Sequence, residues 1–242
     1  MRIDKYLVKQ GYFESRNRAI ETIKNGDISI DGRMAKPSTK VDEYSEIKIK
    51  QSKFYVSRAA KKLERFLQEH LVGINGKRAL DIGSSTGGFA QIILENDVKS
   101  LDCVDVGHDQ LHHSLRNNSV INLHEETDIR SFKSEKCFSL VTCDVSFISI
   151  LQIIDDINRL SCEDSDIVIL YKPQFEVGKD AKRDNKGVLK NQDIVEKAMN
   201  NFEIHIKSMG WKLVYKTKSR LTGKEGNIEY IYHFTKSQSI LD

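Results

Sequence analysis

The sequence Ala-Leu-Asp-Ile-Gly-Ser-Ser-Thr-Gly-Gly-Phe at residues 79–89 joins an apolar run to a loop of small residues. The apolar run holds a single acid, Asp81, and an apolar helical pattern follows the loop at Phe89, Ile92 and Ile93. A short apolar run, a glycine-rich break and then helical periodicity predict a strand that passes through a tight turn into a helix.

The turn itself contains three glycines, Gly83, Gly87 and Gly88. Backbone without side chains lets a ligand approach the amide groups of such a loop. The spacing is not the G-x-G-x-x-G of a dinucleotide-binding loop, and the lysine of a phosphate-binding loop is absent. The pattern favours a small adenosine-type ligand at the carboxyl end of a strand, although an ordinary strand-to-helix turn explains it equally well.

Length and composition indicate a soluble globular protein. The chain has 242 residues, of which 39% are hydrophobic and 30% charged, enough for one large domain or a medium domain with a small appendage. No apolar run approaches the roughly 18 residues of a membrane helix, and the first residues lack the apolar core of a signal peptide. We therefore expect a cytoplasmic protein.

The cysteines carry no metal-binding or disulfide signature. None of the four forms a C-x-x-C pair, and three fall in or beside apparent strands. We expect buried, reduced thiols and neither a zinc site nor a disulfide framework. No metal is predicted. The four residues are Cys103, Cys137, Cys143 and Cys162.

Positive charge is concentrated in the first quarter of the chain. Residues 1–55 contain 12 Lys and Arg against 8 Asp and Glu, whereas residues 56–242 are close to neutral. This distribution is expected if the first segment binds a polyanion, and a solvated basic surface without a partner is the alternative.

Residues 1–50 have the pattern of a small α+β unit. Apolar stripes at helical spacing occupy 3–7 and 19–23, and Ser15 is placed to cap the second helix. Asn25-Gly26 is expected to end that helix, and a strand then enters the hairpin signal Asp31-Gly32.

The segments RIDKYLVKQGYFESRNRAIETIKNGDISIDGR and KPSTKVDE resemble the alpha-L RNA-binding domain first described in the small-subunit ribosomal protein number four. The resemblance implies that the second helix and the hairpin grip folded RNA, with basic side chains on phosphates and 2′-hydroxyls. The residues expected to contact RNA are Arg2, Lys5, Arg16, Arg18, Lys24, Arg33 and Lys36.

Residues 51–56 are interpreted as a linker, and residues 57–242 as a second domain that opens with a helix capped by Ser57. Strands are expected at 79–82, 101–106, 120–124, 138–143 and 166–171, and a closing hairpin at 212–217 and 228–234. Helices are expected near 88–96, 109–117, 150–160 and 191–208. The alternation predicts an α/β fold with a doubly wound, Rossmann-like sheet and an antiparallel last strand at its edge region.

Several polar residues fall where these strands end. Asp105 lies at the end of the second strand, Asp128, Asp144 and Lys172 follow the third, fourth and fifth strands, and Glu229 lies in the final hairpin. Ligands of open α/β sheets bind at the carboxyl ends of the strands, so these side chains should converge. For each residue alone, surface capping or a salt bridge is the commoner explanation.

The whole chain resembles the TlyA family of ribosomal RNA methyltransferases, which are sometimes called hemolysins, and its second domain is similar to FtsJ-type 2′-O-methyltransferases. The matching motifs are YVSRAAKKL, ALDIGSSTGGF, CVDVGHDQL, CDVSFISI, YKPQFEVGK, NKGV and GNIEY. The resemblance implies that S-adenosylmethionine is the cofactor and that ribosomal RNA or a ribosomal subunit is the partner. It also implies a cytidine ribose as target, with the large subunit favoured and the small subunit methylated in parts of the family.

The resemblance also assigns residues to roles. It implies a catalytic tetrad composed of Lys62, Asp144, Lys172 and Glu229. It implies a cofactor pocket composed of Gly83, Ser84, Gly87, Gly88, Phe89, Asp105, Asp128, Asp144 and Phe147, with Phe147 at the methionine end. Asp128 and Glu225 depart from the family pattern, in which Asn and a small residue are common. Lys61 points about 100° away from Lys62 on a helix and is placed outside the site.

Methyl transfer to a ribose hydroxyl is an in-line displacement, in which the protein orients the hydroxyl and helps it to lose a proton. Lys172 could act as a neutral base or as a cation that stabilises the developing alkoxide, and the sequence leaves both roles open. Three other interpretations remain: a structural ion-pair cluster, a membrane-acting hemolysin, and an RNA-binding ribosome-assembly factor without activity.

Overall fold

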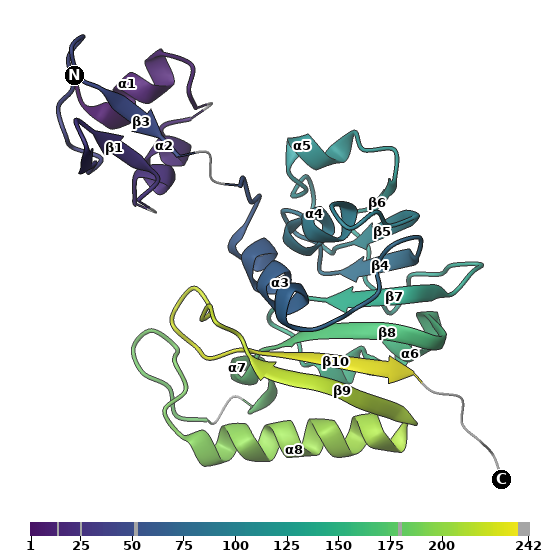
Figure 1. The fold of residues 1–242 in the computed structure, drawn as a ribbon. Coiled ribbons are helices and arrows are strands. Elements are labelled where there is room, and N and C mark those ends of the chain that lie inside the picture. The colour runs from purple at the N-terminus through teal and green to yellow at the C-terminus, as the bar shows by residue number, and fades with distance from the viewer. Residues whose placement is uncertain (14, 25, 51–52, 179–180, 237–242) are drawn as a thin grey trace. The chain divides into compact units, whose positions relative to one another are not determined.

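The computed structural model describes residues 1–13, 15–24, 26–50, 53–178 and 181–236. The chain divides into two compact units, Met1–Phe54 and Tyr55–Asp242 (Figure 1). The division falls within the segment interpreted as a linker, of which residues 51–52 lie outside the described part.

The N-terminal unit has the predicted α+β composition. Its elements are the helices α1 (Ile3–Lys9) and α2 (Arg16–Lys24) and an antiparallel sheet of β1 (Ile28–Ile30), β2 (Arg33–Met34) and β3 (Ile47–Ile49). Ser15 caps α2 as predicted, since its hydroxyl accepts a hydrogen bond from the Arg18 amide at 3.3 Å. Asp31 and Gly32 both have positive φ, 49° and 76°, as a tight hairpin between β1 and β2 requires. Asn25 lies outside the described residues.

One acid is buried completely in this unit. The Asp4 side chain has no exposed surface, and the guanidinium groups of Arg2 and Arg16 bind it at 3.0 Å and 2.8 Å. Burial alone would raise the pKa of Asp4, but hydrogen bonds from Arg2 and Arg16 and their charges lower it below its usual value. Two of the arginines expected to contact RNA therefore also neutralise a buried carboxylate.

The second unit is built on a seven-stranded sheet with the order β6-β5-β4-β7-β8-β10-β9. Its strands are β4 (Arg78–Ile82), β5 (Ser100–Val104), β6 (Ile121–His124), β7 (Phe138–Cys143), β8 (Ser161–Tyr171), β9 (Trp211–Lys218) and β10 (Tyr230–Lys236). The strands from β6 to β8 are parallel, and β10 is antiparallel to both of its neighbours. The antiparallel last strand is confirmed, but β10 lies between β8 and β9, one place inside the edge.

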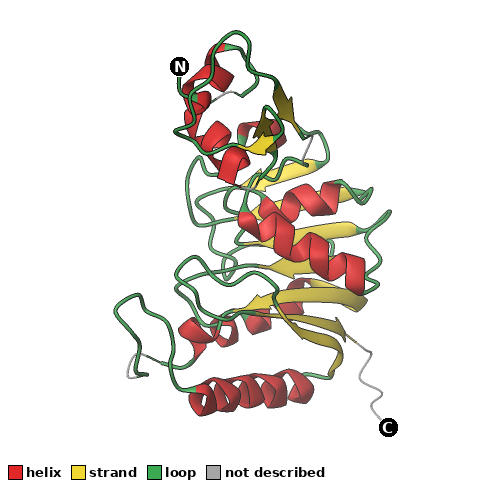
Figure 2. Ribbon diagram, turned by 60° about the vertical axis from the view of Figure 1, so that its left-hand side comes forward, coloured by secondary structure: helices red, strands yellow, loops and turns green. Residues whose placement is uncertain are grey.

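Helices cover both faces of this sheet, which confirms the doubly wound arrangement (Figure 2). They are α3 (Arg58–Glu69), α4 (Gly88–Leu94), α5 (His113–Arg116), η1 (Ile150–Gln152), α6 (Ile154–Leu160), α7 (Pro173–Glu176) and α8 (Gln192–Ser208). One apolar core packs α3 and α4 against the sheet, and a second packs α6 and α8 against the opposite face.

Three local predictions for this unit are confirmed only in part. The helix expected at 109–117 is reduced to α5, because the chain takes a positive φ of 52° at Asp109. The helix expected at 150–160 is divided at Ile153, whose φ of −126° is not helical. Ser57 stands at the N-cap of α3, but its hydroxyl makes no capping hydrogen bond.

The cysteines are only partly as predicted. Cys103 and Cys143 are buried free thiols, whereas Cys137 and Cys162 form a disulfide. Cys137 precedes β7 and Cys162 lies at the start of β8, and these strands pair with Phe138 opposite Ser161. The sheet register therefore brings together two cysteines that are 25 residues apart, which their spacing in the sequence does not reveal.

We expect the Asp4→Asn variant to destabilise the N-terminal unit by about 2 kcal/mol, because two guanidinium groups lose their anionic partner. Folding lowers the pKa of Asp4. Its contribution to the free energy of unfolding is therefore complete above roughly pH 3.9 and is lost as the pH falls through the pKa of the folded state. Hydrogen exchange of α1 and α2 amides in the full-length protein would measure both effects. Exposed Glu43→Gln is the control, and equal protection in the two variants would contradict the role of Asp4.

Candidate active site

The glycine loop joins β4 to α4, as the sequence predicts, but its glycines are required by the packing of the protein itself. A Cβ at Gly83 would lie 2.8 Å from the Asp144 carbonyl oxygen, and φ is 75° there. A Cβ at Gly88 would collide with the Ser57 hydroxyl, and one at Gly87 with leucine side chains of the 111–115 segment. The absence of side chains thus lets β7 and α3 approach the loop closely.

Asp105 follows β5 and faces this loop. Its Oδ2 accepts a hydrogen bond from the Ser85 amide at 2.8 Å, and its Oδ1 accepts one from the Gly107 amide at 2.7 Å. The two amides fix the carboxylate, and each oxygen keeps a further lone pair for a ligand hydroxyl. Asp105 borders a cavity of about 370 Å³, called here the Asp105 cavity.

Asp128 borders the same cavity but has a protein partner of its own. The Arg130 guanidinium donates to both carboxylate oxygens, to Oδ1 at 3.0 Å and to Oδ2 at 2.5 Å. Hydrogen bonds from the Arg130 side chain and amide lower the pKa of Asp128 to about 2. The sequence did not indicate this pair. Val106, which is 72% exposed, and buried Ile129 add apolar surface to the cavity.

Asp81, the single acid of the apolar run before the loop, is completely buried and was not among the predicted site residues. Its Oδ1 accepts a hydrogen bond from the Thr142 hydroxyl at 2.6 Å, whereas its Oδ2 has no hydrogen-bond partner among the described residues. Burial raises the pKa of Asp81 to about 7. It borders a cavity of about 310 Å³, the Asp81 cavity, together with Ser57 and Ser84. The hydroxyls of these serines also lack partners in the described part of the chain.

The four residues of the implied tetrad form two ion pairs. Lys62 of α3 lies 2.5 Å from Glu229, which precedes β10, and Lys172 after β8 lies 2.6 Å from Asp144 after β7. No side chain of the four is more than 15% exposed. The Lys172 ammonium also donates to the Ser146 hydroxyl at 2.8 Å.

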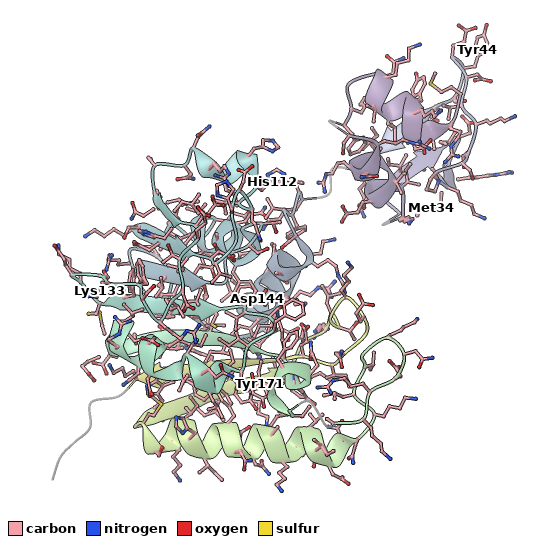
Figure 3. All side chains as sticks on the ribbon, turned by 180° about the vertical axis from the view of Figure 1, so that it is seen from behind. Met34, Tyr44, His112, Lys133, Asp144 and Tyr171 are labelled. Atoms are coloured by element: carbon pink, nitrogen blue, oxygen red, sulfur yellow. A yellow bond between two sulfur atoms is a disulfide. The ribbon has the colours of Figure 1, made fainter. Side chains whose placement is uncertain are left out.

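The strand order explains how these residues meet. β7, β8 and β10 are adjacent, and Tyr230 of β10 lies opposite Tyr171 of β8. Because β10 is antiparallel, its first residues lie at the edge where the parallel strands end. Glu229 is thereby brought beside Lys172, and Figure 3 shows Asp144 and Tyr171 near this end of the unit.

Lys62, Lys172 and Glu229 border a third cavity of about 620 Å³, the Lys62 cavity. Lys172 also borders the Asp81 cavity, and Ser146 borders all three cavities. The three cavities therefore meet at the loop after β7, with the ion pair between Lys172 and Asp144 at their junction. Ser146 could have been found only from this meeting, since a lone serine after a strand carries no signal.

Phe147 and Phe89 were both expected near the cofactor. Phe89 is buried and borders the Asp81 cavity. Phe147 is 91% exposed, has a positive φ of 66°, and contacts the ring of Phe175 at 5.2 Å. It borders the Asp105 and Lys62 cavities, whereas Asp81 borders the Asp81 cavity, whose lining does not include Phe147. Phe147 therefore stands at the boundary between two cavities.

The basic residues expected to contact RNA lie in the N-terminal unit. Arg2 and Arg16 bind Asp4, and the Arg18 guanidinium lies 4.0 Å from the centre of the Phe54 ring. The remaining four have exposed side chains: Lys5, Lys24, Arg33 and Lys36.

No three His, Cys, Asp or Glu side chains in the part of the chain that the structure describes are grouped so that they could hold a metal ion. None of its helices combines the length and the apolar character that crossing a membrane requires.

Two family models match the two units. The FtsJ-like methyltransferase model matches residues 55–236, and the S4 domain model matches residues 1–47. A methyltransferase fold is also found in a crystal structure of an S-adenosylmethionine-dependent methyltransferase from Listeria monocytogenes. That structure has a TM-score of 0.56 at 15% identity and covers 75% of this chain and 100% of the other.

Curated relatives match over nearly the whole length. The 23S rRNA (cytidine-2′-O)-methyltransferase TlyA of Campylobacter jejuni is 45% identical, over 98% of this chain and 100% of that protein. The 16S/23S rRNA (cytidine-2′-O)-methyltransferase TlyA of Mycobacterium tuberculosis is 35% identical, over 95% of this chain and 87% of that protein. Hemolysin A of Brachyspira hyodysenteriae is also 35% identical, over 97% and 99%.

A solved structure of a protein from Streptococcus thermophilus, named as a hemolysin, has a TM-score of 0.74 and 32% identity, and covers 99% of this chain and 89% of the other. The two domains, their order in the chain and the full-length identity to proteins named TlyA all point to the same family. The chain belongs to the TlyA family, with an N-terminal S4 domain and an FtsJ-like methyltransferase domain.

Proposed function

We propose that this protein transfers a methyl group from S-adenosylmethionine to the ribose 2′-hydroxyl of a cytidine in ribosomal RNA. The observation that carries the proposal is the meeting of three cavities at the ion pair between Lys172 and Asp144. Such a junction suits a reaction that joins a donor and an acceptor at one point. The names of the relatives from Campylobacter and Mycobacterium support the reaction and the substrate.

The Asp105 and Asp81 cavities fit the two ends of the cofactor. Asp105 would accept hydrogen bonds from the ribose hydroxyls, and Val106 and Ile129 would pack against the adenine. Oδ2 of Asp81, which lacks a partner among the described residues, suits the ammonium group of the methionine end, and the hydroxyls of Ser57 and Ser84, for which the same holds, suit the carboxylate. When bound, the cofactor supplies an already activated methyl group.

The Lys62 cavity is assigned to the acceptor nucleotide. Lys172 borders this cavity and lies 2.6 Å from Asp144, so its side-chain nitrogen would stand beside an acceptor hydroxyl bound there. We assign to Lys172 the tasks of orienting this hydroxyl and of stabilising the negative charge that develops as its proton leaves. The pair of Lys62 and Glu229 forms the other side of the acceptor site.

The target is proposed from the relatives and from the N-terminal unit. The Campylobacter relative, at 45% identity, is named for 23S rRNA, so a cytidine of the large subunit is the first expectation. The Mycobacterium relative, at 35%, is named for both subunits, and a small-subunit target is the second. The S4 domain and its basic residues would hold the RNA by its shape.

Replacing Lys172 with alanine should lower the methylation rate of ribosomal subunits by at least about 100-fold, because the charge beside the acceptor oxygen is lost. Binding of S-adenosylmethionine, measured by calorimetry, should persist. The matched control is Lys61→Ala, since Lys61 lies one residue from the site and its ammonium instead contacts the Tyr55 ring at 5.3 Å. Full activity of the Lys172 variant, or equal losses in both variants, would refute the assignment.

The pKa of Asp81 in the free protein is about 7, so the carboxylate that binds an ammonium group forms only as the pH rises through that value. Affinity for S-adenosylmethionine should therefore weaken roughly tenfold for each pH unit below 7. Calorimetry between pH 5.5 and 7 would measure this slope. In Asp81→Asn the slope should vanish, while thermal stability at neutral pH is retained because the variant buries no charge. An unchanged slope in that variant would exclude Asp81 as its origin.

A further inference from the structure

Two loops form the outer walls of the Lys62 cavity. One joins α7 to α8 and includes residues 183–189, and the other joins β9 to β10 and includes residues 219–227. Both project beyond the same end of the sheet (Figure 1). They are called here the first and the second wall loop.

The first wall loop is folded by its own hydrogen bonds. Arg183 and Leu189 form an isolated β-bridge, and the Asp184 carboxylate accepts from the amides of Lys186 at 2.8 Å and Val188 at 3.0 Å. The Arg183 guanidinium donates to the Gly178 carbonyl at 2.9 Å. The loop is thus a small hairpin, and it presents Lys186 at its turn.

Asn227 joins the two wall loops. Its side chain is buried, with only 7% of the residue exposed, and both ends of the amide are used. Oδ1 accepts from the Leu189 amide at 3.0 Å, and Nδ2 donates to the Gly187 carbonyl at 3.1 Å. Its own carbonyl accepts from the Gly223 amide at 2.8 Å. A buried amide satisfied on both sides fixes the separation of the segments that it connects.

Positive charge collects where these loops border the cavity. Lys186 of the first loop, Lys224 of the second and Arg58 of α3 are exposed and border the cavity. Arg58 also donates to the Thr222 carbonyl at 2.8 Å, which ties α3 to the second loop. Glu225 is the acid that accompanies these cations, whereas deeper in the cavity each lysine of the tetrad is paired with a carboxylate. The exposed opening of the cavity, its mouth, therefore carries an excess of positive charge, whereas the charges of the buried tetrad are paired.

We infer that the two wall loops form a clamp for the RNA backbone, in which Lys186 and Lys224 contact phosphates on either side of the target nucleotide and Asn227 sets their separation. This inference rests on the proposed function. Because the tetrad is buried, a ribose reaches it only by entering the Lys62 cavity, and the phosphates on either side then remain at the opening of the cavity. Contacts to those phosphates position the nucleotide without reading its sequence.

The first test measures the affinity of the full-length protein for purified large ribosomal subunits at several salt concentrations. The double variant Lys186→Ala/Lys224→Ala should bind at least about tenfold more weakly at 0.1 M salt, and its slope of log affinity against log salt should be smaller by about 1.5. Calorimetric affinity for S-adenosylmethionine should not change. The control variant Lys207→Ala/Lys212→Ala removes the same charge near the start of β9, at the opposite end of the sheet, and should behave as the wild type.

The second test isolates Asn227 as a positioning residue by a double-mutant cycle. In Asn227→Ala the two lysines remain but their separation is no longer fixed, so Lys186→Ala should cost less affinity in this background than in the wild type. The exposed Asn201→Ala of α8 is the matched control and should leave the effect of Lys186→Ala intact. Additive effects in the Asn227 background would refute the positioning role.

The outcomes separate this inference from the proposed function. Wild-type protein that methylates the subunits, together with a double variant that keeps the wild-type affinity and salt slope, would overturn the clamp and leave the methyltransferase intact. Wild-type protein that binds RNA but transfers no methyl group would refute the proposed function instead.

Discussion

Lys62 and Lys172 lose most of their contact with water, and each meets one carboxylate at 2.6 Å or less. Burying an ammonium group costs free energy unless a carboxylate lies close enough to compensate it. The two ion pairs therefore constrain the strands that carry the carboxylates. Their partners come from different strands, Asp144 after β7 and Glu229 before β10, and they meet only because β10 is inserted antiparallel beside β8. The position of the last strand is therefore a requirement of the site as well as a feature of the fold.

Charge is arranged in layers around these pairs. Asp81 lies at the base of the loop between β4 and α4, where burial raises its pKa to about 7 and one of its oxygens has no hydrogen-bond partner in the described part of the chain. A carboxylate in that state gains from a cationic ligand, and the ammonium group of the proposed cofactor would be such a ligand. At the opposite boundary, Lys186 and Lys224 are exposed and face solvent from loops that Asn227 joins. In the proposed function, Asp81 would bind one end of the methyl donor, the two ion pairs would surround the reacting atoms, and Lys186 and Lys224 would contact the polyanionic acceptor.

Much of this could be predicted from the sequence, because strand and helix periodicity and the polar residues at strand ends are local signals. The order of β8, β10 and β9 could not be predicted from the sequence, and neither could the disulfide between Cys137 and Cys162. Both depend on which strands become neighbours in the sheet. The sequence correctly placed the glycines in a loop between a strand and a helix, but it did not reveal why glycine is needed there. Only the structure shows that a Cβ at Gly83 would meet the Asp144 carbonyl. Near-neutral charge over residues 56–242 likewise concealed the cations gathered at one cavity.

The most direct test of the account is to identify the methylated nucleoside. Ribosomal subunits would be incubated with the full-length protein and S-adenosylmethionine carrying an isotopically labelled methyl group, and the RNA would then be digested to nucleosides and analysed by mass spectrometry. We predict that the label appears in 2′-O-methylcytidine. Label on a nucleobase, or no label in RNA from subunits that the protein binds, would contradict the arrangement of donor and acceptor around Lys172 that the structure supports.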